Sequence, residues 1–369
     1  MYENDNRVVM TLDAGGTNFV FSAIQGCREI IEPIRVNAVT DDINGCLIAI
    51  RDGFKAVETA LKPLKPVAIS FAFPGPADYG NGIIGDLPNF PCFRGGVALG
   101  PYLEEEFRIP VFINNDGNLF AYGEALAGKL PEINRSLEDT GSTMRYGNLT
   151  GLTFGTGFGC GVVIGGKLLS GDNGCGGDMW LMRNSLHPEM IAEESVSIRA
   201  AKRVYSELSG EHDSSLSPKD IFEIAEGRHP GNAGAAKKSF EELGTAAADA
   251  LANTLDIVDG LVVIGGGLSG AYKYIVPAMV NRLESTLSTF SGDSFPLTQS
   301  RVYDLTCEQG MSEFTKDESR TVEVPMTGKT ARYRFVKKVG ISVSSLGTST
   351  AVSLGAYTFA LSTLDNQAR

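Results

Sequence analysis

The sequence predicts an α/β fold built from two similar domains, and three observations support this. Short apolar runs that are typical of strands alternate with longer segments of helical periodicity, which is the pattern of α/β proteins. Two glycine-rich strand–turn–strand segments lie about 140 residues apart and form an internal repeat. The length of 369 residues is enough for two domains, since a domain typically has about 150 residues.

Composition and charge narrow the possible functions. Apolar residues make up 43% and charged residues 21%, which is ordinary for a soluble globular protein. The net charge of −12 argues against a nucleic-acid partner, which would need basic patches, but it permits an anionic nucleotide at a local site. The chain has no apolar run long enough to span a membrane and no signal-peptide pattern at its polar N-terminus, so we expect a cytoplasmic protein.

The first glycine-rich turn joins predicted strands at residues 8–12 and 19–24. Its residues are small or polar: Asp13, Ala14, Gly15, Gly16, Thr17 and Asn18. The glycines let a ligand approach the backbone, and the threonine and asparagine add groups that suit phosphate oxygens. The aspartate could hold Mg²⁺, directly or through water. A tight hairpin with a polar tip explains the same residues equally well.

The next segments continue the alternation of strands and helices. We expect a third strand at 27–34, a helix at 42–61, a strand at 67–73 and a helix at 99–107. A turn cluster that contains Gly75 follows the strand at 67–73, and an irregular loop that contains Asn89 comes next. Long loops in compact domains are often functional, although an irregular surface loop is the alternative.

A polar elbow lies between a predicted strand at 111–113 and a predicted helix at 119–126. It contains one carboxylate among three carboxamides: Asn114, Asn115, Asp116 and Asn118. Ligands of open α/β sheets bind at such strand ends, and a carboxylate there could act as general base on a hydroxyl. Helix capping by Asn and Asp is the alternative, but the density of amide groups favours a polyol-binding site.

The second glycine-rich turn lies between predicted strands at 149–154 and 162–164. Four of its seven residues are glycine: Gly155, Thr156, Gly157, Phe158, Gly159, Cys160 and Gly161. It is neither a Walker P-loop nor a dinucleotide fingerprint, because no helix follows. A simple glycine-rich hairpin is the alternative. Two such hairpins on similar domains could hold one phosphate chain from both sides.

The remainder of the chain is predicted to be mainly helical, with helices at 193–208, 218–226, 238–255 and 268–287. A strand at 259–264 ends in Gly265, Gly266 and Gly267. These glycines suggest close approach of the backbone to a flat ligand such as a nucleoside, and a helix-entry turn is the alternative. Residues 291–338 are polar with strand-like pieces and are interpreted as a β-rich excursion, and a last helix is expected at 349–361.

The ordered set of motifs resembles the ROK family of bacterial sugar kinases (repressors, open reading frames, kinases). The motifs are Asp13–Asn18, Asn115–Asn118, Gly155–Gly161 and Gly265–Gly267, and the likeness runs from about residue 7 to residue 365. The resemblance implies two duplicated ribonuclease-H-like, actin-like ATPase domains with a cleft between them. The first would comprise residues 1–125 and the C-terminal helix, 349–369. The second would comprise residues 126–348.

The resemblance also implies roles for individual residues. ATP phosphates would be held by Gly15, Gly16, Thr17, Asn18, Gly155, Thr156 and Gly157, and the adenosine would be bordered by Gly265, Gly266 and Gly267. Asp13 would position Mg²⁺, and Asp116 would be the base that faces the reactive sugar hydroxyl. Further sugar contacts would come from Gly75, Asn89 and Asn115.

The chain departs from the family pattern after the second glycine-rich turn. The family commonly has a sugar-contacting Glu and a zinc-binding His, and here Asp178 and Leu181 stand at those positions. The six cysteines have no CxxC spacing, so we expect reduced thiols and no zinc site. A second sugar-contacting Glu of the family matches Glu193, with Glu194 as the competing choice.

These observations favour an ATP-dependent sugar kinase that phosphorylates a hexose hydroxyl, with the 6-position of glucose as first choice. An N-acetylated amino sugar is the alternative substrate. A sugar-binding protein with a decayed active site would explain Asp178 and Leu181. A sugar-sensing repressor would need an N-terminal helix-turn-helix, for which no room remains before the first strand. Members of the family often form dimers, so a homodimer is also expected.

Overall fold

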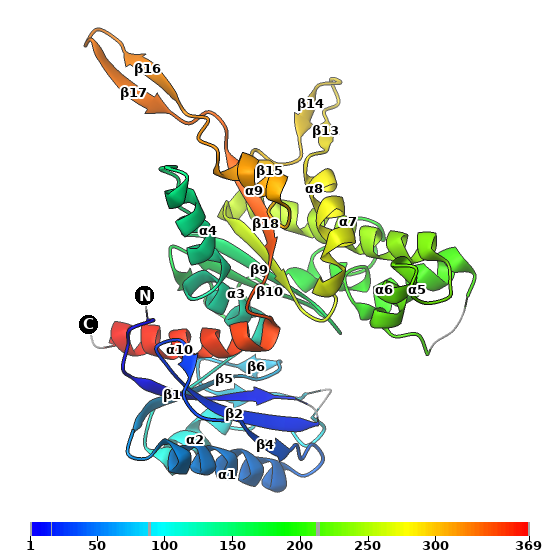
Figure 1. Cartoon of the computed structure of the whole chain (residues 1–369). Coiled ribbons are helices and arrows are strands. Elements are labelled where there is room, and N and C mark those ends of the chain that lie inside the picture. The colour runs from blue at the N-terminus through cyan, green and yellow to red at the C-terminus, as the bar shows by residue number, and fades with distance from the viewer. Residues whose placement is uncertain (1, 16, 88–89, 212–214, 368–369) are drawn as a thin grey trace. The chain divides into compact units, whose positions relative to one another are not determined.

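The computed structural model describes residues 2–15, 17–87, 90–211 and 215–367. The chain divides into two compact units, coloured along the chain in Figure 1. The first comprises Met1–Gly128, Gly161–Gly177 and Leu346–Arg369, and the second comprises Lys129–Cys160 and Asp178–Ser345. The first unit thus includes residues 161–177, which the sequence assigned to the second domain.

The first unit contains a six-stranded sheet of order β3-β2-β1-β5-β8, in which β4 also pairs with β2. Its strands are β1 (Val8–Ala14), β2 (Asn18–Gln25), β3 (Arg28–Glu29), β4 (Ile34–Asn37), β5 (Pro66–Ala72) and β8 (Val111–Asn114). A separate hairpin consists of β6 (Ala77–Asp78) and β7 (Ile83–Ile84). Strands β1, β5 and β8 are parallel, so their carboxyl ends lie at one edge. The single strand expected at 27–34 is wrong, because Pro33 has no N–H to donate and the pairing stops between β3 and β4.

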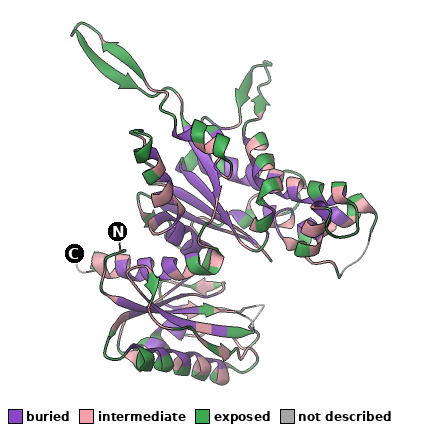
Figure 2. Cartoon of the chain, viewed as in Figure 1, coloured by how far each residue is buried: buried purple, intermediate pink, exposed green. Residues whose placement is uncertain are grey.

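Helices cover both faces of this sheet: α1 (Ile43–Leu61), α2 (Leu99–Phe107), α3 (Asp116–Leu126) and α10 (Thr348–Gln367). The predicted helix at 42–61 is confirmed, and Asp42 caps it by accepting hydrogen bonds from the N–H groups of Asn44 and Gly45. Helices α1 and α2 share a core with the sheet that is rich in phenylalanine. Helix α10 packs on the other face, where Leu354 and Tyr357 form a cluster with Val9. Figure 2 shows these faces as buried.

Helices α3 and α10 cross at a pair of glycines. A Cβ atom on Gly355 would overlap the carbonyl oxygen of Leu119, and one on Gly123 would overlap that of Ala351. Only glycine permits this approach of two backbones. The position of α3 on the sheet therefore depends on the missing side chains at Gly123 and Gly355.

A second six-stranded sheet repeats the plan of the first, with order β11-β10-β9-β12-β18-β15, and its β11 and the end of β10 fall within the segment 161–177 named above. Its strands are β9 (Leu149–Phe154), β10 (Phe158–Ile164), β11 (Lys167–Leu168), β12 (Leu261–Gly265), β15 (Arg301–Asp304) and β18 (Lys338–Val343). As in the first sheet, a meander leads into parallel strands, here β9, β12, β18 and β15. The internal repeat expected from the two glycine-rich turns is therefore present.

The helices of the second unit are α4 (Lys129–Asp139), α5 (Ile198–Ser209), α6 (Pro218–Ala225), α7 (Ala233–Val258), α8 (Tyr272–Leu283) and α9 (Glu308–Thr315), with short 3₁₀ turns η1 (Met179–Leu181), η2 (Ala192–Glu194) and η3 (Ser269–Ala271). Helix α7 is much longer than the predicted segment at 238–255. The helix expected at 193–208 begins only at Ile198, after η2. No helix in the described part of the chain is both long and apolar enough to cross a membrane.

The β-rich excursion expected at 291–338 consists of two hairpins with part of the core between them. The hairpins are β13 (Thr286–Ser288) with β14 (Ser294–Pro296), and β16 (Arg320–Val324) with β17 (Lys329–Tyr333). Between them, β15 and α9 pack in the body of the unit, where Val302, Tyr303 and Phe314 are buried. Treating the whole segment as an excursion was therefore wrong. Figure 1 shows the two hairpins projecting from the second unit.

We predict that Gly355→Ala will lower the thermal stability of the chain. The added methyl has no space at the α3–α10 crossing, and overpacking of this kind costs about 1–3 kcal/mol. Gly80→Ala is the matched control in the same unit, because the nearest atom to its Cβ would be Asp78 Oδ1 at 3.7 Å. Thermal unfolding by circular dichroism measures both. Equal melting temperatures for the two variants would contradict the tight crossing.

Candidate active site

The carboxyl edge of the first sheet brings together residues that the sequence predicted separately. Asp13 lies at the end of β1, Gly75 follows β5, and the Asn114–Asp116 elbow follows β8. The loop after β5 is joined to the end of β8 by a hydrogen bond from Phe73 N to Asn114 O, at 3.0 Å. Since β1, β5 and β8 are parallel neighbours, their carboxyl ends form one edge, and ligands of open α/β sheets usually bind at such an edge.

The elbow after β8 is held in place by its own side chains. Asn115 is the N-cap of α3, and its Oδ1 accepts hydrogen bonds from Gly117 N at 2.8 Å and Asn118 N at 3.4 Å. Asn114 Oδ1 accepts from Asn115 N at 2.8 Å and from Asn118 Nδ2 at 3.0 Å. The capping alternative for Asn115 is thus correct. Because the cap uses only its oxygen, the Nδ2 group remains able to donate to a ligand hydroxyl.

Asp116 occupies the first turn of α3 with its carboxylate accessible to solvent. Its Oδ1 accepts a hydrogen bond from Gly117 N at 2.9 Å. Surrounding protein atoms raise the pKa of this carboxyl by desolvation, and the charge of Asp13 raises it further, while the hydrogen bond from Gly117 lowers it. The net pKa lies above the ordinary value for aspartate, which makes the carboxylate a better proton acceptor.

The β1–β2 turn is narrow and open to solvent. Gly15 N donates to Asn18 O at 3.0 Å, and a Cβ on Gly15 would lie only 3.0 Å from the same oxygen. Thr17 and Asn18 are exposed, and Gly16 lies outside the described residues. The turn therefore has accessible backbone and side-chain groups of the kind that bind phosphate oxygens.

Asp13 is exposed and lies at one end of a pocket of about 600 Å³ between the sheet and the start of α10, where Ser349 also lines it. No cluster of three or more His, Cys, Asp or Glu side chains able to hold a metal occurs in the described ranges. A single carboxylate still fits Mg²⁺, which binds through one or two carboxylates together with substrate phosphates and water. Asp13 is suited to that role.

Of two other residues expected to contact a sugar, Gly75 and Asn89, the structure describes only Gly75. Gly75 follows β5. A Cβ atom at this position would lie 3.1 Å from the hydroxyl oxygen of Tyr79. That hydroxyl donates to Phe73 O at 2.9 Å and so fixes the loop after β5. Asn89 lies outside the described residues, and its role stays a prediction.

In the second unit, Glu193 is bound to the Gly155–Gly157 turn. Its Oε2 accepts a hydrogen bond from Phe158 N at 3.0 Å, and a Cβ on Gly157 would lie 2.6 Å from the same oxygen. Its Oε1 pairs with Arg199 at 2.9 Å, and Arg199 also donates to Thr156 O at 3.3 Å. Glu193 therefore shapes the turn, a role that the sequence did not predict. Its contact with a sugar stays a prediction.

Asp178 has a different environment from Glu193. Solvent reaches its side chain, and no hydrogen bond to the carboxylate is found among the described residues. Partial burial raises the pKa of this carboxyl. The competing residue, Glu194, is paired with Arg199 at 2.6 Å. Of these three acidic residues, Asp178 has the carboxylate least occupied by protein partners.

The three glycines after β12 have different roles. Gly265 is buried within β12, and Gly266 adopts φ +87° where a Cβ would overlap the backbone of Phe154. Gly267 has no atom within 4 Å of a Cβ position and faces a pocket of about 230 Å³. Only Gly267 thus lines open space, while Gly266 permits the close contact between β12 and the end of β9.

The pocket beside Gly267 belongs entirely to the second unit. Its other lining residues come from α6, α7 and the η3 turn: Pro218, Lys219, Phe222, Phe240, Leu268, Gly270 and Ala271. The rings of Phe222 and Phe240 lie edge to face, with centroids 6.4 Å apart. These lining residues were not predicted from the sequence. The phenylalanines in the predicted helices were the available signal, but core packing explains such residues equally well.

Both units thus combine a ribonuclease-H-like sheet with a glycine-rich turn, which is the architecture of sugar kinases with the actin-like ATPase fold. The sequence profile of the ROK family matches residues 9–318, and the chain belongs to the ROK family. The resemblance predicted from the ordered motifs is confirmed.

Three relatives illustrate the similarity. The crystal structure of a glucokinase from Parabacteroides distasonis ATCC 8503 has 57% sequence identity and a TM-score of 0.89, covering 98% of this chain and 99% of that one. A glucokinase of Thermotoga maritima is 26% identical over 310 residues, which are 77% of this chain and 93% of that protein. An N-acetyl-D-glucosamine kinase of Vibrio atlanticus is 28% identical over 295 residues, with coverages of 74% and 89%.

We predict that Glu193→Ala will disturb the Gly155–Gly157 turn and raise the KM for ATP by about tenfold, because an unpaired buried N–H costs about 1–3 kcal/mol. Phe158 is buried, so water cannot readily replace the lost acceptor. Glu193→Gln keeps an acceptor oxygen and should lie close to the parent. Glu194→Ala, which removes the other carboxylate paired with Arg199, is the control and should leave the KM unchanged. Equal KM values for Glu193→Ala and the control would show that the turn does not need this carboxylate.

Proposed function

We propose that this chain is an ATP-dependent hexose kinase of the glucokinase type, with the O6 hydroxyl of glucose as its first-choice acceptor. The observation that carries the proposal is Asp116, a carboxylate with raised pKa on the functional edge of the first sheet. Membership of the ROK family and the high identity to a glucokinase over nearly the whole chain support the same conclusion.

In the proposed reaction, Asp116 accepts the proton of the sugar hydroxyl as its oxygen attacks the γ-phosphorus of ATP. The new O–P bond forms while the bond from the γ-phosphorus to the β,γ-bridging oxygen breaks, so the products are a sugar phosphate and ADP. Phosphoryl transfer depends mainly on positioning and charge neutralisation. We therefore expect the sugar hydroxyl to lose its proton to Asp116 late in the step. The cap at Asn115 holds Asp116 at the start of α3, and the Asn115 Nδ2 group would donate to a neighbouring sugar hydroxyl.

The nucleotide would be held by the two glycine-rich turns and by the pocket beside Gly267. The Gly155–Gly157 turn and the Gly15–Asn18 turn would donate backbone N–H groups to the phosphates, and the pocket beside Gly267 would receive the adenine. The aromatic and aliphatic lining of this pocket suits a flat heterocycle. Asp13 would hold Mg²⁺, which supplies charge neutralisation to the phosphates when bound. We also propose that the enzyme works in the cytoplasm, where ATP is available.

An N-acetylhexosamine is the second candidate acceptor, because a relative of similar coverage is an N-acetyl-D-glucosamine kinase. Asp178 stands where the family has Glu, so its carboxylate is one methylene shorter and the sugar must sit closer or bind through water. A sugar-binding protein without turnover is the alternative to an enzyme. Asp116 and the two turns argue for turnover, since sugar binding alone does not require a phosphate site.

We predict that purified protein releases ADP from Mg-ATP in the presence of one sugar of a panel of glucose, N-acetylglucosamine, mannose, N-acetylmannosamine, fructose and allose. Asp116→Asn should bind that sugar normally but lose several orders of magnitude in kcat, because the amide cannot accept the proton. Asp52→Asn, on the exposed side of α1, is the control and should keep full activity. A near-normal rate in Asp116→Asn would remove Asp116 from the role of base. Thermal stabilisation by a sugar without any ADP release would support the binding protein instead.

We predict an acid limb in the pH profile of kcat that lies above the ordinary aspartate pKa of about 3.9. The folded protein raises the pKa of Asp116, so the base form is lost as the pH falls through that raised value. A raised pKa also means that the folded state disfavours the ionised form of Asp116. Ionisation of Asp116 at neutral pH therefore lowers the free energy of unfolding, and Asp116→Asn removes this loss. The variant should therefore melt no lower than the parent at neutral pH. A lower melting temperature, or a limb at the ordinary value, would contradict the assignment.

A further inference from the structure

We propose that the pocket beside Gly267 accepts GTP and ITP with an efficiency close to that for ATP, and that Lys219 is the residue that recognises the purine. The inference rests on the proposed function, because it takes this pocket to be the site of the nucleotide base. It goes beyond that function by naming the class of phosphoryl donor, which comprises 6-oxopurine as well as adenine nucleotides. All of the residues that carry it lie in the second unit.

The size and surface of the pocket fit a purine without selecting among purines. Its volume of about 230 Å³ is below the range of roughly 300–1,000 Å³ that holds drug-sized ligands, so it suits a single base. Phe222 and Phe240 present aromatic rings, and stacking on such rings tolerates every base because each base has a π-face. A Cβ atom on Gly267 or Gly270 would meet no atom within 4 Å, so no neighbouring atom closes off this side of the pocket. Any choice between purines must therefore come from polar groups.

Lys219 is the one polar side chain among the described residues that line the pocket. It is exposed, and it forms no hydrogen bond or ion pair with the residues that the structure describes. It occupies the first turn of α6, directly after Pro218, where the helix dipole disfavours a cation. Helix stability therefore does not explain a lysine at this position, and its ammonium group is free to bind a ligand.

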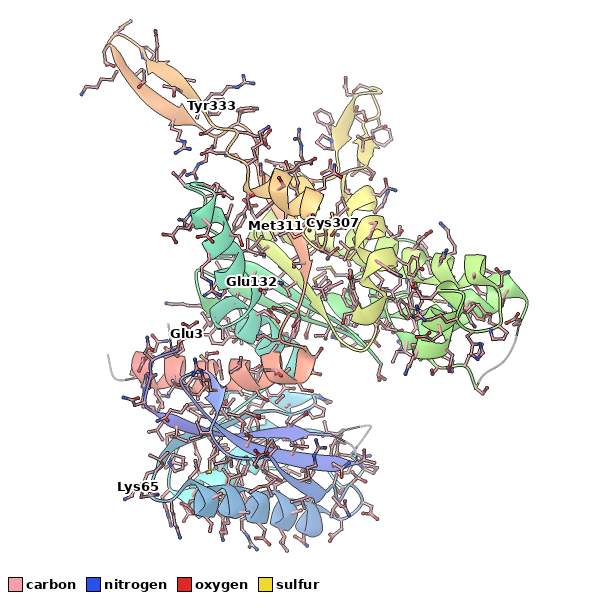
Figure 3. The ribbon with its side chains drawn as sticks, viewed as in Figure 1. Glu3, Lys65, Glu132, Cys307, Met311 and Tyr333 are labelled. Atoms are coloured by element: carbon pink, nitrogen blue, oxygen red, sulfur yellow. The ribbon has the colours of Figure 1, made fainter. Side chains whose placement is uncertain are left out.

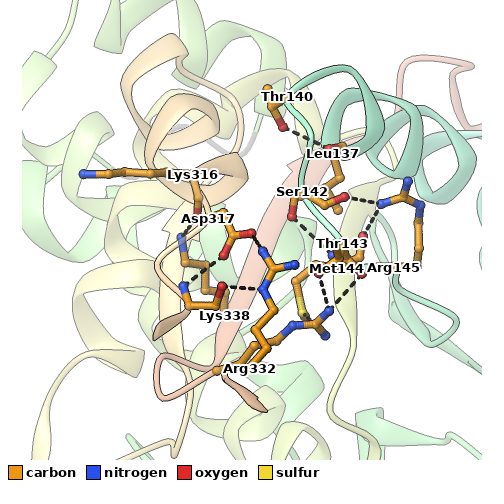
Figure 4. A network of polar contacts seen from close by, with 12 residues as sticks. Leu137, Thr140, Ser142, Thr143, Met144, Arg145, Lys316, Asp317, Arg332 and Lys338 are labelled. Carbon is orange, nitrogen blue, oxygen red and sulfur yellow. Dashed lines mark hydrogen bonds and ion pairs between the residues drawn. The ribbon is translucent and has the colours of Figure 1, made fainter. Parts of the chain in front are cut away.

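Two other lysines of the second unit show the contrast, because acceptors hold both of them. At the base of the β16–β17 hairpin, Lys338 donates to the carbonyl oxygen of Lys316 at 2.8 Å, within the network that Figure 4 shows. Next to α6, Lys273 pairs with Glu226 at 2.5 Å. Lys219 differs from these lysines because no protein acceptor in the described part of the chain competes with a ligand for it.

No carboxylate of α6, which the structure describes in full, is free to receive the amino group of adenine. The acidic residues on this helix and at its C-cap are each bound by neighbours: Asp220 by Ser217, Glu223 by Arg228, and Glu226 by Lys273 and Tyr274. These hydrogen bonds lower the pKa of all three carboxyl groups. The charged group that α6 offers to a base is therefore a hydrogen-bond donor.

A donor of this kind favours 6-oxopurines. Guanine presents two acceptors, O6 and N7, along one edge, whereas adenine presents N7 beside an amino group, which is itself a donor. The 6-oxo group of hypoxanthine gives ITP the same two acceptors as GTP. One ammonium group can therefore donate to both acceptors of a 6-oxopurine but only to N7 of adenine. The pocket thus has an additional contact for GTP and ITP, and its described lining has no side-chain acceptor that would select ATP.

The test compares nucleotides as donors, with formation of the sugar phosphate as the measurement. For the parent protein we expect kcat/KM values for GTP and ITP within about tenfold of the value for ATP, because all three purines share the stacking and the N7 contact. Lys219→Met keeps the aliphatic stem and removes the ammonium group. It should lower kcat/KM for GTP and ITP by about tenfold or more, and for ATP by less, because only the 6-oxopurines lose a contact to O6. Lys219→Arg retains a pair of donors and should retain the use of GTP.

Lys65→Met is the matched control. Lys65, labelled in Figure 3, is an exposed lysine of the first unit and also has no hydrogen-bond or ion-pair partner among the described residues. Its removal should leave kcat/KM unchanged for every nucleotide. A parent protein that uses GTP more than about tenfold less well than ATP would overturn the proposal. Equal losses with ATP, GTP and ITP in Lys219→Met would also overturn it, because Lys219 would then not recognise the base.

The experiment separates this inference from the proposed function. Absence of turnover with every nucleotide and every sugar of the panel would overturn the kinase proposal. Calorimetric titration with GDP and ADP would then decide the choice between purines. Binding of GDP within about tenfold of ADP, weakened in Lys219→Met, would support the inference. Binding of ADP alone, or of neither nucleotide, would overturn it.

Discussion

The proposed chemistry of the first unit depends on the close crossing of α3 and α10. Gly123 and Gly355 let two helix backbones meet without intervening side chains. This contact holds α3 against the sheet, so that its first turn begins directly after β8. Asn115 then caps the helix, and Asp116 is presented at the carboxyl edge beside Asp13. The carboxylate proposed as the base is thus positioned by the packing of its own helix.

The second unit uses a related sheet for a different purpose. Its glycine-rich turn is supported by Glu193 and Arg199, and its parallel strand β12 leads into the pocket beside Gly267. In the first unit the corresponding turn stands next to an acidic residue suited to Mg²⁺. Duplication of one sheet plan therefore gives two glycine-rich turns with distinct neighbours.

The sequence predicted those parts of the site that are local in the chain. Asp116 and its amide neighbours follow a recognisable strand, and the glycine-rich turns are contiguous. It did not predict the role of Glu193, because the hydrogen bond to Phe158 joins residues 35 positions apart. The aromatic pocket was missed for the same reason, since Phe222 and Phe240 meet only in the tertiary structure. In the segment 291–338, burial of Tyr303 and Phe314 overrode a polar composition and placed β15 and α9 in the core.

The pocket beside Gly267 has a consequence for how this protein can evolve. All of its lining residues lie between Pro218 and Ala271, within one unit, whereas Asp116 and its cap lie in the other. Substitutions that exchange one purine nucleotide for another can therefore accumulate in α6, α7 and η3 without touching the acceptor hydroxyl's environment. With the nucleotide and sugar sites as proposed, the residues that select the nucleotide and those that select the sugar lie in different units. Its nucleotide preference could then change in evolution while its sugar preference stays the same.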